Sequence, residues 1–276
     1  MIRLTHPFPS VLDGIVSGAI AFLAGGSSGV ALRIGLAMTL LQLGIGTVND
    51  IVDAPRDAGR KTGKPIPAGL VPLSAARITA GACFIAGIGL AALASPITGL
   101  LAPVVIAIGL VYDLRLKGTA WSWLPFALGI PLLPVFGWAG VTGGLPGPFL
   151  ILLPAAVAAG AALAVGNALV DVERDRAAGV SSIAVALGPP RAWWVLVGLL
   201  ASVLAIATGS VVVAGGGPVA VAAITIAGSV PVLAAIRSRA GSSALRERAW
   251  QAEAVGLAVL AALWIASAVA SGSTAR

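Results

Sequence analysis

The sequence predicts an all-helical integral membrane protein with nine transmembrane helices, for three reasons. Of its 276 residues, 58% are hydrophobic and only 10% are charged, whereas a soluble domain carries about 25% charged residues. Several uncharged runs are long enough to cross a bilayer, which takes about 20 residues of helix. Glycine and proline are spread through these runs, as membrane helices tolerate. We explain the net charge of +7 by membrane topology and therefore expect no nucleic-acid partner.

The uncharged runs give the helices in chain order. Three long runs are each divided into two helices by turns rich in Gly or Pro, at Ser95-Pro96, near 143–148 and near 215–218. The predicted spans are 14–32, 34–49, the two parts of 78–112, the two parts of 119–170, the two parts of 192–236, and 254–275.

A weak internal repeat predicts how these helices are organised. Asn49 with Asp53 resembles Asn167 with Asp171, and each pair ends an even-numbered predicted helix. We expect residues 1–276 to form a single polytopic domain. In it, two four-helix halves, at about 7–118 and 119–240, surround a central cavity, and an extra helix follows at about 249–271.

The charges predict the orientation in the membrane. With nine spans, one face carries 15 of the 17 Lys and Arg residues, and only Arg33 and Arg276 fall on the other face. Basic loops are retained on the cytoplasmic side. We therefore expect the N-terminus and the acidic residues on the cytoplasmic side of the cell (plasma) membrane, and the C-terminus on the opposite side.

Two short acidic motifs follow directly on apolar runs. Residues 49–57 and 171–175 contain six of the ten acidic residues, although a carboxylate at a helix centre costs about 2.5–3.5 kcal/mol on insertion scales. Helical residues four apart share a face, so each motif presents a column of oxygen ligands of the kind that Mg²⁺ prefers. The columns are Asn49, Asp53 and Asp57, and Asn167, Asp171 and Asp175. The alternative is that these are solvated loop charges that pair with Arg56, Arg174 and Arg176.

Basic residues follow the acidic motifs. Lys64 begins the sequence Lys64-Pro65-Ile66-Pro67-Ala68-Gly69, and Tyr112, Arg115 and Lys117 follow the predicted fourth helix. Together with Mg²⁺, such cations could clamp a diphosphate and stabilise charge on a leaving group. Positive-inside topology alone is an equally good explanation of Lys64, Arg115 and Lys117.

These motifs, at this separation, resemble those of the UbiA superfamily of intramembrane prenyltransferases, over roughly residues 7–270. The resemblance implies nine transmembrane helices and two Mg²⁺ ions on a polyprenyl diphosphate, held by Asn49, Asp53, Asp57, Asp171 and Asp175. It also implies that Asp50 supports the ligands, and that Tyr112 and Lys117, or Arg115 in place of Lys117, contact phosphate. We predict that the diphosphate is bound by Arg56, Lys64, Tyr112, Arg115, Lys117 and Asn167.

The predicted function is ionisation of a polyprenyl diphosphate and transfer of its prenyl group to a hydrophobic acceptor, aromatic or lipid. Asp53 and Asp171 are the predicted catalytic residues, and Asp171 could serve as base or acceptor anchor. A terpene cyclase of the same fold, which needs no separate acceptor, is one alternative. A cation or phosphate transporter is another, although a transport path needs polar groups at the membrane midplane, and the acidic residues gather at one face.

Overall fold

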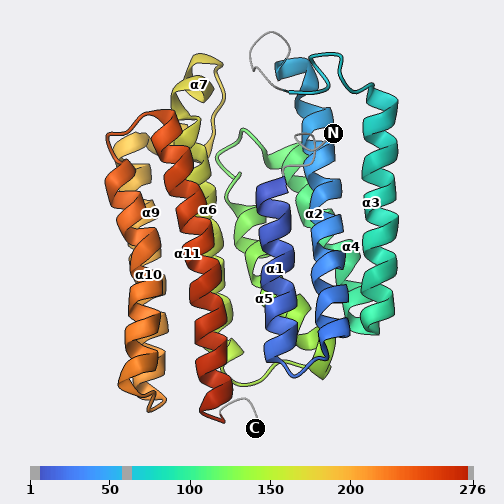
Figure 1. The fold of residues 1–276 in the computed structure, drawn as a ribbon. Coiled ribbons are helices and arrows are strands. Elements are labelled where there is room, and N and C mark those ends of the chain that lie inside the picture. The colour runs from blue at the N-terminus through green and yellow to red at the C-terminus, as the bar shows by residue number, and fades with distance from the viewer. Residues whose placement is uncertain (1–6, 58–63, 273–276) are drawn as a thin grey trace. The chain divides into compact units, whose positions relative to one another are not determined.

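The computed structural model describes residues 7–57 and 64–272, apart from the side chain of Arg56, and this part of the chain contains helices and no strand. The long helices are separated by short turns (Figure 1). They are α1 (Pro7–Leu23), α2 (Ser28–Asp57), α3 (Leu73–Ala94), α4 (Pro96–Val111), α5 (Leu124–Thr142), α6 (Phe149–Val170), α9 (Pro189–Val213), α10 (Pro218–Ser238) and α11 (Ser243–Ala270).

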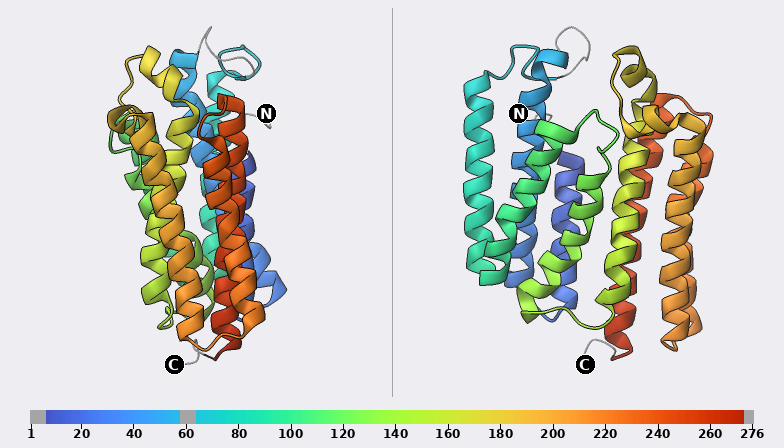
Figure 2. Two further views of the ribbon diagram at one scale, coloured as in Figure 1. Left: turned by 90° about the vertical axis from the view of Figure 1, so that its left-hand side faces the viewer. Right: turned by 180° about the vertical axis from the view of Figure 1, so that it is seen from behind.

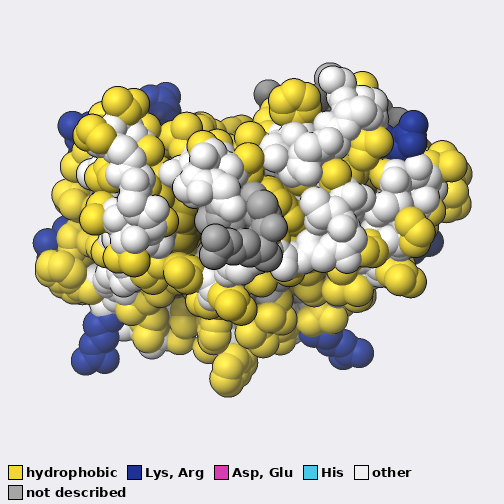
Figure 3. All heavy atoms as spheres, turned by 90° about the horizontal axis from the view of Figure 1, so that it is seen from below, with side chains coloured by type: hydrophobic (Ala, Val, Ile, Leu, Met, Phe, Trp, Pro, Cys, Tyr) yellow, Lys and Arg dark blue, Asp and Glu magenta, His cyan; other side chains and the backbone are white. Residues whose placement is uncertain are grey.

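The described helices fit a membrane environment. Eight of them are long and apolar enough to cross a bilayer, and α1, with 17 residues, is shorter. Large apolar side chains are exposed on their outer faces, for example Leu150 at 82% and Val213 at 89%, where acyl chains would contact them. Seen from the end opposite α7 (Val172–Ala177), the surface is mostly hydrophobic, and no described Asp or Glu is in view (Figure 3). The prediction of an all-helical membrane protein is confirmed, whereas the arrangement of nine spanning helices around a cavity stays a prediction.

The helices belong to two compact units. One contains residues 1–115 and 132–144, where α2 packs against α1, α3 and α4. The other contains residues 116–131 and 145–276, where α6, α9, α10 and α11 form a four-helix bundle in which each helix packs against the next (Figures 1 and 2). Helix α5 contributes its first residues to the second unit and its remainder, from Leu132, to the first.

The first hairpin lies earlier in the chain than predicted. The predicted spans 14–32 and 34–49 placed a turn at Arg33, but the chain turns after Leu23, and α2 begins at Ser28. Gly25 adopts φ +89° in this turn, a conformation that residues with a side chain rarely take. Arg33 instead lies within α2, and its guanidinium donates a hydrogen bond of 2.8 Å to the carbonyl oxygen of Leu93. A run of uncharged residues hides such a turn, because the turn itself needs no charge.

Short helices also occupy segments that we predicted as loops. Tyr112–Leu116 forms a π-helical turn, η2, which directly continues α4. In the second unit, α7 (Val172–Ala177) and α8 (Ile183–Leu187) lie between α6 and α9 in the chain.

Glycine permits a close approach between α1 and α2. A Cβ atom on Gly14 would lie 1.8 Å from Oγ1 of Thr39 and 2.6 Å from the carbonyl oxygen of Gly35. Small residues at such contacts allow two membrane helices to pack backbone against backbone. Gly14 is therefore required by packing. A Cβ atom on Gly89, in α3, would by contrast meet no neighbouring atom within 4 Å.

We expect Gly14→Ala to lower the thermal unfolding temperature of the detergent-solubilised protein. Alanine is favoured over glycine within a helix by about 1 kcal/mol, but overpacking costs about 1–3 kcal/mol. The matched control, Gly89→Ala, gains the same helix preference without a clash and should be as stable as the wild type or more stable. Equal effects of the two substitutions would contradict the close contact.

Candidate functional site

The first acidic motif occupies the last turns of α2. The helix continues through Pro55 to Asp57, so Asn49, Asp53 and Asp57 do follow one another at helical spacing. Asp53 and Asp57 are buried, with 7% and 6% of their surface exposed, and Asp50 is 2% exposed. Three buried carboxylates at one helix end repel each other unless a cation lies among them.

A fourth buried carboxylate joins this motif. Asp113 lies in η2, is 4% exposed, and accepts a hydrogen bond of 2.6 Å from the side-chain amide of Asn49. The predictions from sequence did not include Asp113 among the site residues. A signal was present, because Asp113 is the first charge after the predicted fourth span, as Asp50 is after the second.

Lys64 supplies positive charge to the motif. Its ammonium group forms an ion pair with Oδ1 of Asp50 and lies 3.9 Å from Oδ2 of Asp57. The turn that carries Lys64 is held by apolar packing, since Val71 and Ala76 form a small buried cluster with partly buried neighbours on α2, in the turn itself and at the start of α3, which are Ile51, Ile66 and Ala75. An ammonium group placed among these oxygens shows that the cluster can accommodate a cation.

The remaining predicted phosphate-binding residues lie in different surroundings. Tyr112 is half-buried in η2, and Arg115, in the same turn, is exposed. Lys117 is half-buried and belongs to the second unit. The side chain of Arg56 lies outside the described part of the structure.

The second acidic motif is not one continuous helical column, which corrects our prediction. Helix α6 ends at Val170 and α7 begins at Val172, so the half-buried Asn167 lies on α6 and Asp175 on α7. Asp171 lies at the junction with φ −103° and ψ 4°, outside the helical region. The backbone amide of Asp175 still donates to the carbonyl oxygen of Asp171 at 2.9 Å, which keeps the two residues one turn apart.

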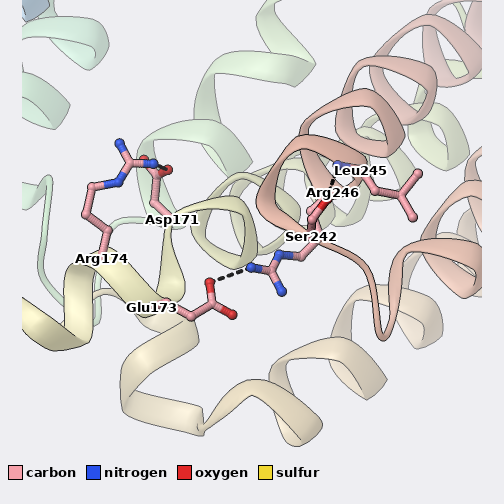
Figure 4. A network of polar contacts seen from close by, with 6 residues as sticks. All are labelled: Asp171, Glu173, Arg174, Ser242, Leu245 and Arg246. Atoms are coloured by element: carbon pink, nitrogen blue, oxygen red, sulfur yellow. Dashed lines mark hydrogen bonds and ion pairs between the residues drawn. The ribbon is translucent and has the colours of Figure 1, made fainter. Parts of the chain in front are cut away.

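Arginines pair with acidic residues of the second motif (Figure 4). Arg174 forms an ion pair with Asp171, and both side chains are well exposed, at 48% and 38%. Arg246 of α11 forms an ion pair with Glu173 of α7. The hydrogen bond from Arg246 lowers the pKa of Glu173. The pairing of Asp171 with Arg174 is the one that the solvated-charge alternative anticipates.

Within each unit, the structure brings part of the predicted site together. In the first unit, hydrogen bonds and ion pairs join Asn49 to Asp113 and Lys64 to Asp50 and Asp57, while Asp171 and Asp175 share a turn in the second. Among the described residues, no three His, Cys, Asp or Glu side chains already form a metal-binding group. The donor set of carboxylate and amide oxygens nevertheless suits Mg²⁺ by its chemistry.

Comparison with known proteins identifies relatives over most of the chain. The UbiA prenyltransferase family matches residues 14–252. Chlorophyll synthase of Oryza sativa subsp. japonica is 32% identical over 166 residues, which cover 56% of this chain and 44% of that protein. Digeranylgeranylglyceryl phosphate synthase of Methanoculleus marisnigri is 32% identical over 119 residues, which cover 43% of each chain. The matched region thus spans less than half the length of these two curated relatives.

Solved structures share the fold. A UbiA homologue from Archaeoglobus fulgidus bound to GPP and Mg²⁺ aligns with a TM-score of 0.72 and 18% identity over 94% of this chain and 98% of that one. The apo structure of a UbiA homologue from Aeropyrum pernix K1 aligns with a TM-score of 0.72 and 20% identity over 95% and 97%. The predictions of family resemblance and of Mg²⁺ agree with these relatives.

We expect Lys64→Met to lower the unfolding free energy by about 1–3 kcal/mol, since it removes the cation that faces a buried carboxylate. Thermal unfolding in detergent measures the loss. The double variant Lys64→Met with Asp50→Asn should lose less than the sum of the single substitutions, because the two side chains contact each other. Strictly additive losses would show that the ion pair contributes nothing to stability.

A second prediction concerns pH. Because the pKa of Glu173 is lowered in the folded protein, its ion pair contributes stability above the ordinary glutamate pKa of about 4.3 and loses that contribution as the pH falls through the lowered value. At neutral pH, Glu173→Gln should therefore reduce the unfolding free energy slightly, by less than about 1 kcal/mol, because Glu173 is exposed. Once the pH is below the lowered pKa, the substitution should no longer change the unfolding free energy. Thermal unfolding across this pH range measures the difference. Glu247→Gln is the control, and a pH-independent difference at Glu173 would refute the pair.

Proposed function

Since the chain belongs to the UbiA prenyltransferase family, we propose that it is a Mg²⁺-dependent prenyltransferase that ionises a polyprenyl diphosphate and transfers the prenyl group to a hydrophobic acceptor. The observation that carries this proposal is the cluster of buried carboxylates at the end of α2, Asp50, Asp53 and Asp57. Carboxylates that are buried to this extent need nearby cations to balance their negative charge. The UbiA homologue from Archaeoglobus fulgidus, which shares this fold, binds both Mg²⁺ and the prenyl diphosphate GPP.

The proposed ligands are Asn49, Asp53 and Asp57 from the first motif and Asp171 and Asp175 from the second. When bound there, Mg²⁺ would neutralise the diphosphate and make it a better leaving group. Asp50 supports the ligands from behind and pairs with Lys64, and Asp113 fixes the amide of Asn49. The amide oxygen of Asn49 is thereby directed away from the Asp113 contact.

The diphosphate itself is bound by basic and polar groups near both motifs. We assign this role to Arg56, Lys64, Tyr112, Arg115, Lys117 and Asn167. Loss of the diphosphate leaves an allylic cation that water would quench. The apolar helices exclude water, as an ionisation step requires. Asp171 is then the proposed base that accepts the proton which the acceptor loses on alkylation.

The acceptor is aromatic or lipid in this proposal. Relatives named digeranylgeranylglyceryl phosphate synthase support a lipid acceptor, and those named chlorophyll synthase support a ring acceptor. The acidic motifs and the N-terminus would lie on the cytoplasmic side of the plasma membrane, because the basic loops gather on that side.

Diphosphate release tests the metal site. Purified protein with Mg²⁺ and a geranylgeranyl or other allylic diphosphate should release diphosphate, and EDTA should stop the release. Asp53→Asn should slow it by roughly 100-fold, a typical loss when one group that stabilises the developing charge is removed. Glu247→Gln, an exposed acid on α11, should retain the wild-type rate. Release that is unchanged in Asp53→Asn, or that persists without divalent cations, would reject the proposal.

Product mass spectrometry of the same reactions identifies the acceptor class. With a glycerol-phosphate lipid and a chlorin offered separately, a prenylated adduct should form with one of them. A cyclised hydrocarbon formed without any acceptor would instead establish the cyclase alternative.

A further inference from the structure

The four-helix bundle of the second unit contains a mostly apolar pocket with a few charged side chains, which the proposed reaction does not use. It has a volume of about 150 Å³, comparable with a cavity that holds a molecule of about six carbon atoms. Its walls come from all four helices and the start of α7. The lining residues that matter here are Gly166 of α6, Trp193 of α9, Arg239 after α10, and Arg246 and Glu253 of α11.

The most unusual group in this pocket is the carboxyl group of Glu253. The residue is only 1% exposed, and its Oε2 atom finds no hydrogen-bond partner among the described residues. Gly166 makes room for it, because a Cβ atom at that position would lie 2.8 Å from Oε2. A buried carboxyl group without a partner is costly, so its position calls for a donor inside the pocket.

An arginine, Arg246, lies on the same side of α11 as Glu253. Arg246 precedes Glu253 by two helical turns, which places both on one face of the helix. Its side chain is 16% exposed, and one of its terminal nitrogens forms an ion pair with Glu173 (Figure 4). Its Nε atom, in contrast, has no partner among the described residues. The pocket therefore lacks one hydrogen-bond donor, at Glu253, and one acceptor, at Arg246.

A second guanidinium group adds positive charge to the pocket lining. Arg239 stacks on Trp193, with 4.5 Å from its guanidinium carbon to the ring centroid, and lies 5.7 Å from the centroid of Trp194. The indole nitrogen of Trp193 is already used, since it donates to the carbonyl oxygen of Ala235 at 2.9 Å. Trp193 therefore serves as a platform that fixes Arg239, which leaves the edge of the guanidinium group available to an anion.

We propose that this pocket binds a primary ammonium group joined to a phosphate, as in an ethanolamine phosphate headgroup. The ammonium group donates to the buried carboxylate of Glu253, and the phosphate accepts from Arg246 and Arg239. The headgroup can come from phosphatidylethanolamine or from a soluble phosphoethanolamine, which share this chemistry. The site adjoins the second acidic motif through Val172 and the ion pair of Arg246 with Glu173, but Asn167, Asp171 and Asp175 are not among its lining residues.

Other occupants fit less well. The described residues around Glu253 include no second acid or histidine in the pocket lining, so a metal ion would have one carboxylate ligand only. A phosphatidylglycerol headgroup has no cation for Glu253. A phosphatidylcholine headgroup carries a cation without N–H donors, so it cannot hydrogen-bond to Oε2. Water could satisfy both arginine and glutamate but would give no preference among lipids.

Lipid binding to the intact, delipidated protein tests the inference. Native mass spectrometry and thermal shift, with short-chain phosphatidylethanolamine, phosphatidylcholine and phosphatidylglycerol added in turn, should show a preference for phosphatidylethanolamine of about tenfold or more, as expected for a charged hydrogen bond. Soluble phosphoethanolamine in the same assay separates the sources. Binding of the soluble compound at comparable concentration identifies a free metabolite, and binding only of the lipid identifies a membrane component.

Two variants make the test specific to the pocket. Glu253→Gln should abolish the preference over phosphatidylglycerol, and Arg239→Gln should weaken phosphatidylethanolamine binding about tenfold, with circular dichroism to confirm folding. If Glu253→Gln does not fold, Gly166→Ala, whose Cβ displaces the carboxyl group, replaces it. Equal binding of the three lipids by the wild type, or a preference that survives in these variants, would overturn the proposal. If the protein released no diphosphate, the proposed function would fail, but this inference would still stand or fall on the lipid-binding measurement alone.

Discussion

The first unit depends on one electrostatic constraint, which is the concentration of negative charge at the end of α2. Asp50, Asp53 and Asp57 are all buried there, and the carbonyl end of a helix adds further negative potential. Lys64 must therefore lie close to Asp50, and the turn that carries it must pack on α2 and α3 to keep it there. The burial of the apolar anchor formed by Val71 and Ala76 serves this requirement.

The negative charge of the second acidic motif is balanced in a different way. Asp171 lies at a break between two helices and pairs with Arg174 in solvent, so water and a nearby arginine already balance its charge. Exposed carboxylates of this kind can exchange partners at little cost, whereas the buried acids of α2 cannot. Under the proposed function, the first motif would fix the metal position, and the second would adapt to the substrate that arrives.

The sequence predicted what depends on composition and spacing. The apolar runs predicted the helices, and the Asn49, Asp53 and Asp57 column is helical as expected. Prediction failed where local geometry decides. The turn at Gly25 has no charge to mark it, and the break at Asp171 depends on backbone angles that no spacing rule contains. Asp113 and Glu253 were missed as functional candidates because their burial results from packing between helices distant in sequence.

The tight hairpin of α1 and α2 bears on how the protein is made. Asp13 lies within α1, and one acid within an apolar segment weakens its insertion by the translocation machinery by about 2.5–3.5 kcal/mol when central. The turn between α1 and α2 is short, and Gly14 lets the two backbones touch near this acid. We expect the two segments to enter the bilayer as a pair during synthesis, so that α2, with 30 residues, carries the shorter α1, with 17 residues, into the bilayer with it.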